Sequence, residues 1–329
     1  MVVNLDNRHL APREEFIVGL SEQRVRPTFG GHEKFVFRHG WLKKGVDGVK
    51  ENPLIFTNDE ALITLGVGKN MVRSIRHWCL ATGLVEEMDG AGLARPLQAT
   101  SLAELLLDDH GWDPYLEDIG SLWLLHWNLS TNLVRGFVWH LMFSKFLESE
   151  FTKRHLANYL SSQFEHYDIH TTSGTIDREI DVCLKTYVPT VRSKLGTISE
   201  ETLDCPLAEL DIIRFIPDDN VYRFNVGPKV SLPLGVFGYA LFSFLPSVAI
   251  NRRTVAVDEC LYHEGSPGQI FKLDENSVVE YLEALEEVTG GKIRLQETAG
   301  LRQVYLDASP GEDYRVQAME MLRGHYEQG

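Results

Sequence analysis

The strongest constraint on the fold of this chain is a row of apolar residues with helical spacing in its first third. The row consists of five residues separated by four, four, four and three positions: Val67, Met71, Ile75, Cys79 and Thr82. Residues at this spacing share one side of a helix, so they predict a helix from about Gly68 to Ala81 with that side buried. Lys69, Arg73 and Arg76 fall on a different stripe, which we expect to face solvent.

The flanking residues predict the elements on either side of this helix. A short basic helix is expected after Arg38. Residues Thr57 to Glu60 fit a capping box, which would begin a helix at Asp59 that Gly66 ends. Residues 84–93 predict a strand, a glycine-rich turn and a returning strand. Helix, helix, turn, helix and hairpin in this order are the winged-helix layout.

The remainder of the chain predicts further small helical units. Residues 113–151 are rich in Trp and Leu and indicate core helices, residues 151–189 predict a second helix-turn-helix, and residues 275–306 predict a helix followed by two strands. We therefore predict an α+β fold, mostly α-helical, with winged-helix or helix-turn-helix modules and short β-hairpins. The expected units are a basic winged-helix domain at 1–100, a helical domain at 101–200 and a C-terminal α+β domain at 201–329 that is winged-helix-like.

The charge of the chain is unevenly distributed. A net charge of −15 by itself argues against a nucleic-acid partner, because cations bind phosphates. Residues 1–95, however, hold 13 Lys or Arg against 12 Asp or Glu. No acidic residue lies between Glu60 and Glu86, so we expect Arg73 and Arg76 to lack a carboxylate partner and to be available to DNA. The alternative is that they are ordinary solvated surface charges.

Seven residues are predicted to contact DNA: Arg38, Lys43, Lys44, Lys69, Asn70, Arg73 and Arg76. Lys69 and the helix start suit phosphate, whereas Asn70 and the arginines can reach base edges or backbone. The sequence Gly66-Val-Gly-Lys-Asn is not a nucleotide-binding P-loop. Ile63 stands where that motif needs glycine, and Asn70 stands where it needs Ser or Thr.

Two groups of residues are candidates for phosphodiester cleavage. His32 and Glu33 precede the cations Arg38, Lys43 and Lys44, so they could serve as a base or as metal ligands beside a bound phosphate. The competing interpretation is that His32 is a hydrogen-bonded loop residue.

The second group consists of Asp177, Glu179, Asp181 and Lys185. Asp177 and Asp181 are four positions apart and would repel on a helix, unless a divalent metal such as Mg²⁺ offsets the repulsion. Such a metal could activate water for hydrolysis. The alternative is that Asp177 complements the helix N-terminus and Asp181 pairs with Lys185.

Simple sequence patterns predict the cellular compartment of the protein and the redox state of its cysteines. No apolar run approaches the roughly 20 residues that span a bilayer, and the N-terminus lacks a signal peptide's apolar core, so we expect a cytoplasmic protein with no membrane partner. The four cysteines are scattered without a CxxC pair, which favours reduced, structural roles. We also expect the tryptophans Trp41, Trp78, Trp123 and Trp127 to be core residues.

Several strings resemble a known family: GGHEKFVFRHGWLKKG, LGVGKNMVRSIRHWC, DPYLEDIGSLWLLHW, IDREIDVCLKTYV, SPGQIFKL and AGLRQVYL. They are similar to a bacterial family of uncharacterised domains encoded beside DNA phosphorothioation genes, the SspB-like family, from about Gly30 to Leu306. The resemblance implies a DNA-binding, DNA-nicking protein of antiphage defence. It also implies that the protein acts together with a cysteine desulfurase, an ATPase and an ATP-pyrophosphatase-like enzyme. It supplies no catalytic residues.

Three functions are compatible with the sequence. The first is a DNA-binding protein that nicks DNA with a divalent metal, as a homodimer or a monomer. The second is a non-catalytic scaffold that recognises DNA and recruits the sulfur-transfer enzymes. The third, a transcriptional regulator, is weaker because more than 200 residues follow the first DNA-binding unit.

Overall fold

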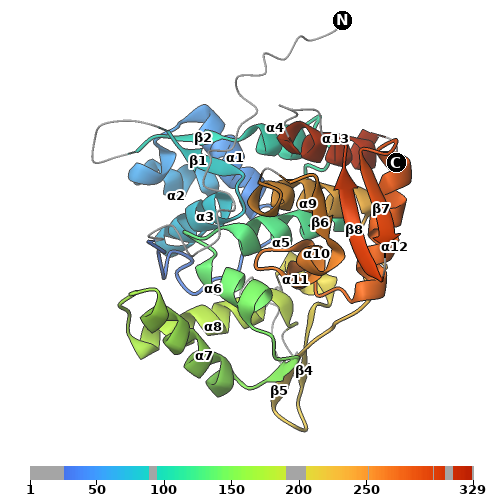
Figure 1. Cartoon of the computed structure of the whole chain (residues 1–329). Coiled ribbons are helices and arrows are strands. Elements are labelled where there is room, and N and C mark those ends of the chain that lie inside the picture. The colour runs from blue at the N-terminus through green and yellow to red at the C-terminus, as the bar shows by residue number, and fades with distance from the viewer. Residues whose placement is uncertain are drawn as a thin grey trace, which may run out of the picture.

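The structure, a computed structural model, describes residues 26–88, 95–189, 205–250, 252–298, 300–307 and 314–327. Most of these residues are helical, and their strands form three small antiparallel sheets (Figure 1). This confirms the mostly helical class with short β-hairpins that the sequence predicts. None of the helices in these segments is both long and apolar enough to cross a membrane.

The first third contains the predicted elements in the predicted order. They are α1 (Trp41–Glu51), the 3₁₀ helix η2 (Ile55–Thr57), α2 (Glu60–Leu65), α3 (Lys69–Ala81), β1 (Val85–Glu87) and β2 (Leu97–Ala99). The two strands pair antiparallel, with Val85 opposite Ala99. The returning strand therefore begins at Leu97, beyond the predicted 84–93, and residues 89–94 lie outside the described part of the chain. Of the predicted apolar row, Ile75, Cys79 and Thr82 are fully buried, whereas Val67 and Met71 are only partly buried.

The start of α2 corrects the predicted capping box. The Thr57 hydroxyl donates to the Leu54 carbonyl oxygen at 2.7 Å, so it closes the preceding 3₁₀ turn and does not cap α2. The N-cap residue Asp59 makes no side-chain cap bond, and Asn58 Oδ1 instead accepts from the Glu60 backbone N–H at 3.1 Å. Its amide also donates to the Glu60 carboxylate at 3.3 Å.

The middle third is built around one apolar helix, α5. The elements are α4 (Ser101–Leu107), α5 (Ile119–Thr131), α6 (Phe137–His140), the π-helix η3 (Leu141–Lys145), β3 (Glu150–Phe151), α7 (Lys153–His166) and α8 (Ser173–Tyr187). Every residue from Gly120 to Thr131 is buried, so α5 has no solvent-facing side. Helices α7 and α8, joined by a polar turn, are the predicted second helix pair (Figure 1).

The last third adds two sheets and the remaining helices. The elements are η5 (Pro206–Leu210), β4 (Ile213–Ile216), β5 (Val221–Phe224), α9 (Leu234–Val248), β6 (Thr254–Ala256), α10 (Val257–Tyr262), α11 (Pro267–Ile270), α12 (Glu275–Val288), β7 (Ile293–Thr298), β8 (Leu301–Leu306) and α13 (Tyr314–Glu327). The strand orders are β3-β5-β4 and β6-β8-β7. The predicted helix followed by two strands is confirmed by α12, β7 and β8.

The buried hydrophobic side chains form one cluster that runs from Phe37 to Leu322. The three units predicted from the sequence thus share a core, and their boundaries stay a prediction. The four tryptophans assigned to the core are buried, as predicted: Trp41, Trp78, Trp123 and Trp127. All four cysteines are buried too, and burial raises the pKa of Cys79 and Cys260 to about 12, so these thiols stay protonated.

We expect Trp123→Ala to lower the free energy of unfolding by about 3–5 kcal/mol, because it empties a fully buried site and removes the bond from the indole N–H to Ser231. Denaturant titration followed by circular dichroism measures this change. Tyr115→Ala is the control, since 68% of that side chain is exposed. Equal stability of the two variants would contradict a core role for Trp123.

Candidate nucleic-acid interface

The N-terminal end of α3 is open to solvent. Gly66, with φ 65°, lets the chain turn from α2 into α3, and Gly68 precedes the first helical turn in an extended conformation. A Cβ added at Gly68 would meet nothing within 4 Å, so another molecule can approach this backbone closely. Lys69 and Asn70 are exposed, and the first turn carries no acidic side chain. Backbone N–H groups and a lysine in this arrangement suit an anion.

The two arginines of the α3 stripe both have carboxylate partners, which corrects the expectation that none is near. Arg73 Nη1 lies 3.1 Å from Glu33 Oε1, and Arg76 Nη2 lies 3.0 Å from Glu87 Oε1. The absence of acids between residues 60 and 86 is real, but the fold brings carboxylates from outside that interval. The expectation that Arg73 and Arg76 lack carboxylate partners was wrong, because residues distant in sequence can be close in space.

The other predicted DNA contacts differ in their availability. Arg38 is buried, with its guanidinium carbon 5.2 Å from the centre of the Trp41 ring, a cation–π arrangement. Lys43 lies 2.9 Å from an Asp109 carboxylate oxygen and donates to the Leu107 carbonyl. Lys44 is exposed. Exposed cations suited to DNA therefore gather along α3, while Arg38 and Lys43 serve internal contacts.

The segment from Gly30 to Lys34 is a tightly constrained loop. Glu33 and Lys34 adopt φ of 48° and 69°, the left-handed region that costs roughly 1–2 kcal/mol per residue for side chains with a Cβ. Two turn hydrogen bonds stabilise it, from the Glu33 N–H to the Gly30 oxygen and from the Phe35 N–H to the His32 oxygen. His32 Nδ1 also accepts from the Lys34 N–H at 3.1 Å. The loop thereby presents Glu33 to α3.

The fold brings the two predicted catalytic groups together through Glu179. The Gly30 N–H donates to Glu179 Oε1 at 2.6 Å. His32 Nε2 lies 3.1 Å from the same oxygen, a contact that does not satisfy hydrogen-bond geometry. The His77 ring, on α3, meets the His32 ring edge-on at 5.5 Å, and neither His77 nitrogen has a hydrogen-bond partner among the described residues. Burial and the neighbouring His32 lower the pKa of His77, which keeps it neutral.

This buried group ties α8 to the loop and to α3. His32 is only 1% exposed, so in this conformation it does not reach a DNA phosphate. Glu179 is buried as well and does not face outward with Asp177. The arrangement fits the hydrogen-bonded loop interpretation of His32. Through Glu33, the loop also orients Arg73.

The remaining acids of α8 do not converge. Asp177 and Lys185 are exposed, and neither has a partner in the described segments. Asp181 pairs with Lys153 of α7 at 2.6 Å instead of with Lys185. No group of three metal-binding side chains occurs within the described residues. Asp177 and Asp181 therefore do not fit a ready magnesium site, because the lysine already neutralises one carboxylate.

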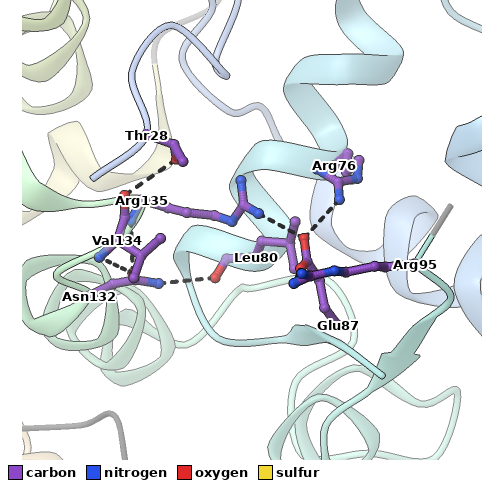
Figure 2. Close-up of polar contacts among 8 residues, drawn as sticks. All are labelled: Thr28, Arg76, Leu80, Glu87, Arg95, Asn132, Val134 and Arg135. Atoms are coloured by element: carbon purple, nitrogen blue, oxygen red, sulfur yellow. Dashed lines mark hydrogen bonds and ion pairs between the residues drawn. The ribbon is translucent and has the colours of Figure 1, made fainter. Parts of the chain in front are cut away.

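Two arginines that the sequence did not single out join the interface. Figure 2 shows Arg95 and Arg135 pointing at Glu87 together with Arg76. Arg135 Nη2 lies 2.9 Å from Glu87 Oε1, and Arg95 Nη1 lies 3.1 Å from Oε2. Arg135 follows an apolar core helix as an isolated charge, and no periodicity links it to residues 76 or 87. Nothing in the sequence alone indicates this cluster.

We expect Glu179→Ala to destabilise the protein by about 1–3 kcal/mol, because it leaves the Gly30 N–H without its acceptor and removes the carboxylate beside His32. Asp177→Ala, on the same helix but exposed, is the matched control and should change stability by less than about 0.5 kcal/mol. Thermal unfolding of both variants is the measurement. If Glu179→Ala stays as stable as wild type while Asp177→Ala loses stability, the buried contact of Glu179 is unimportant.

Comparison with known proteins supports one family. No protein with a curated description matches the chain. A solved structure described as "SspB crystal structure" is 30% identical, with a TM-score of 0.81 over 92% of this chain and 88% of the other. A "Magnesium ion-bound SspB crystal structure" is 29% identical, with the same TM-score and coverage. The predicted resemblance to SspB is confirmed. Residues 29–326 match the family described as "Protein of unknown function (DUF4007)", and the chain belongs to that family.

Proposed function

We propose that this protein binds duplex DNA in a phosphorothioate-modification system of antiphage defence. Two findings support the proposal: the likeness to SspB over 92% of the chain, and the family resemblance of the sequence to proteins encoded beside phosphorothioation genes. The proposed partners are those that the resemblance implies, a cysteine desulfurase, an ATPase and an ATP-pyrophosphatase-like enzyme.

The observation that carries the proposal is the solvent face of α3. This helix follows α1 and α2 and precedes a two-stranded sheet, the order of a winged helix, in which such a helix enters the major groove. Its open N-terminus and Lys69 would meet phosphate, and Asn70 would reach base edges. We infer a winged-helix unit on this basis.

The ion pairs along α3 do not prevent DNA binding. Arg73 is 57% exposed and Glu33 is 30% exposed, and solvated pairs of this kind contribute roughly 0–1 kcal/mol. A DNA phosphate can therefore replace the carboxylate at small cost. Counterion release from the duplex would favour the exchange.

Nicking is a second part of the proposal, with Mg²⁺ as the ion because a magnesium-bound SspB structure is known. Magnesium sites commonly use one or two carboxylates, with water and substrate phosphates as further ligands. Asp177 and Asp181 could serve in this way only after Lys153 moves away. The buried His32 and the paired Asp181 favour the rival function, a scaffold that recruits the sulfur-transfer enzymes.

The double variant Lys69→Ala/Arg73→Ala should weaken binding to a duplex oligonucleotide, because it removes two cations from the α3 face. The slope of log affinity against log salt should become shallower by about one unit for each lost phosphate contact. Fluorescence anisotropy at several salt concentrations gives both quantities.

The control for this experiment is Arg294→Ala/Arg302→Ala, which removes two exposed, ion-paired arginines from β7 and β8. It alters net charge equally and should leave the slope unchanged. A recognition role for α3 is excluded if the two double variants bind DNA alike.

Plasmid relaxation tests nicking. If the protein nicks DNA through these carboxylates, it should relax a plasmid with Mg²⁺ but not with a chelator, and Asp177→Asn/Asp181→Asn should not relax it. DNA affinity of that variant should be equal or slightly higher, because two negative charges are gone. Relaxation by the double variant would remove these carboxylates from the chemistry. No relaxation by the wild-type protein would favour the scaffold.

A further inference from the structure

Three arginines from separate parts of the chain converge on one carboxylate beside α3. Arg76 comes from α3, Arg95 precedes β2, and Arg135 follows α5 (Figure 2). Their nitrogens lie 3.0, 3.1 and 2.9 Å from the two Glu87 oxygens. The four side chains together carry a net charge of about +2, counting each group at its usual ionisation state.

The carboxylate does not satisfy these arginines. A guanidinium has about five N–H donors, so three guanidinium groups present many more donors than two carboxylate oxygens can accept. Burial lowers the pKa of Arg135, and the neighbouring charge of Arg76 lowers it further. Partial burial raises the pKa of Glu87, but its arginine partners outweigh this effect and hold the pKa below its ordinary value. Among the described residues, the cluster therefore holds more positive than negative charge.

The backbone keeps Arg135 in place despite this repulsion. Asn132 Oδ1 accepts from the Val134 and Arg135 N–H groups at 3.1 and 2.9 Å. The Asn132 amide donates to the carbonyl oxygens of Leu80 and Ala81, both at 3.1 Å, at the C-terminal end of α3. Figure 2 shows the bond to Leu80. The loop after α5 is thus fastened to the helix that carries Arg76.

A second contact fixes the same loop from outside. The Thr28 N–H donates to the Val134 carbonyl oxygen at 2.8 Å, and the Thr28 hydroxyl donates to it at 3.3 Å (Figure 2). The backbone of Arg135 needs no reordering when the side chain binds an anion, because hydrogen bonds hold the loop on two sides. Guanidinium groups arranged in advance lose less entropy when they bind.

The cluster continues the α3 stripe. Lys69, Arg73 and Arg76 span about 10 Å at the usual rise of a helix, and Glu87, the partner of Arg76, also contacts Arg95 and Arg135. Exposure increases outward, from 18% at Arg135 through 33% at Arg76 to 65% at Arg95. Of the three arginines, Arg95 is therefore the most accessible to a ligand from solvent.

We propose that Arg76, Arg95 and Arg135 form a binding site for a DNA backbone phosphate, and that Glu87 occupies this site until DNA displaces it. The inference rests on the proposed DNA binding and adds a second anchor to it. A phosphodiester brings forked oxygen acceptors that match guanidinium donors, and it can accept from more than one arginine at once. Glu87 lies in β1 at 25% exposure, so it can withdraw toward solvent.

The test compares Glu87→Gln, Arg95→Ala and Arg135→Ala by duplex anisotropy at several salt concentrations. Glu87→Gln should raise affinity several-fold, since the competing charge is gone. Each arginine variant should lower affinity by about tenfold at low salt and flatten the salt slope by about one unit. Arg95 is largely exposed, so its variant remains informative if Arg135→Ala unfolds.

The outcomes separate this inference from the proposed function. Failure of the wild-type protein to bind duplex DNA overturns both. If wild type binds and Lys69→Ala/Arg73→Ala weakens it, but Glu87→Gln and Arg95→Ala leave affinity and slope unchanged, only the phosphate site is overturned. A loss of stability without a change in slope would make the cluster a structural ion pair.

A further experiment distinguishes a DNA backbone phosphate from free inorganic phosphate as the ligand of this site. Inorganic phosphate at millimolar concentration is added in a thermal-shift assay of wild-type protein. A backbone site predicts no stabilisation below about 10 mM, since one phosphate lacks the other α3 contacts. Stabilisation that Arg135→Ala abolishes would point instead to a free phosphate ligand and would overturn the assignment to DNA.

Discussion

Helix α5 has no exposed side, and its side chains bond to elements from all three parts of the chain. The Asn128 amide donates to the Thr82 carbonyl at the end of α3, at 3.0 Å. His126 bonds the Tyr187 hydroxyl of α8 at 2.7 Å and the Ile270 carbonyl of α11 at 3.0 Å. Burial lowers the pKa of His126 to about 4, so the ring stays neutral and these bonds cost no buried charge. Polar contacts inside an apolar core fix orientation where packing alone would tolerate sliding.

This central helix explains why the candidate interface combines residues so distant in sequence. The end of α5 leads into Asn132, which bonds the end of α3 and sets the backbone of Arg135. On the other side of α3, Glu179 of α8 holds the loop that carries Glu33. The α3 cations are therefore oriented from both flanks by elements that also pack on α5. Rigid support of this kind is what a binding surface needs to bind without first becoming ordered.

Local patterns in the sequence predicted the elements, and tertiary contacts decided the site. Helix α3 differs from its predicted bounds by one residue, and α12 begins at residue 275 as predicted, because apolar periodicity directly reports which side of a helix is buried. The carboxylate partners of Arg73 and Arg135 are 40 and 48 positions away in the sequence, and the carboxylate that accepts from the Gly30 N–H is 149 positions away. No local rule relates such residues. The charge count thus predicted which part of the chain carries the exposed cations, but not that Arg73 and Arg76 have carboxylate partners. The spacing of the acids on α8 likewise did not indicate that Glu179 is buried.

If the α3 face binds DNA as proposed, the carboxylates on it also affect selectivity, because the protein is acidic overall. With a net charge of −15, distant charges oppose association, and each cation of the α3 row that carries its own carboxylate is weakened further. A single phosphate gains little by displacing such a carboxylate. Several phosphates at the spacing of one strand displace several together, and each displacement adds to the affinity. A ligand that makes few of these contacts gains too little to overcome the opposing net charge, whereas one that makes several can bind, and this discriminates against the wrong ligand.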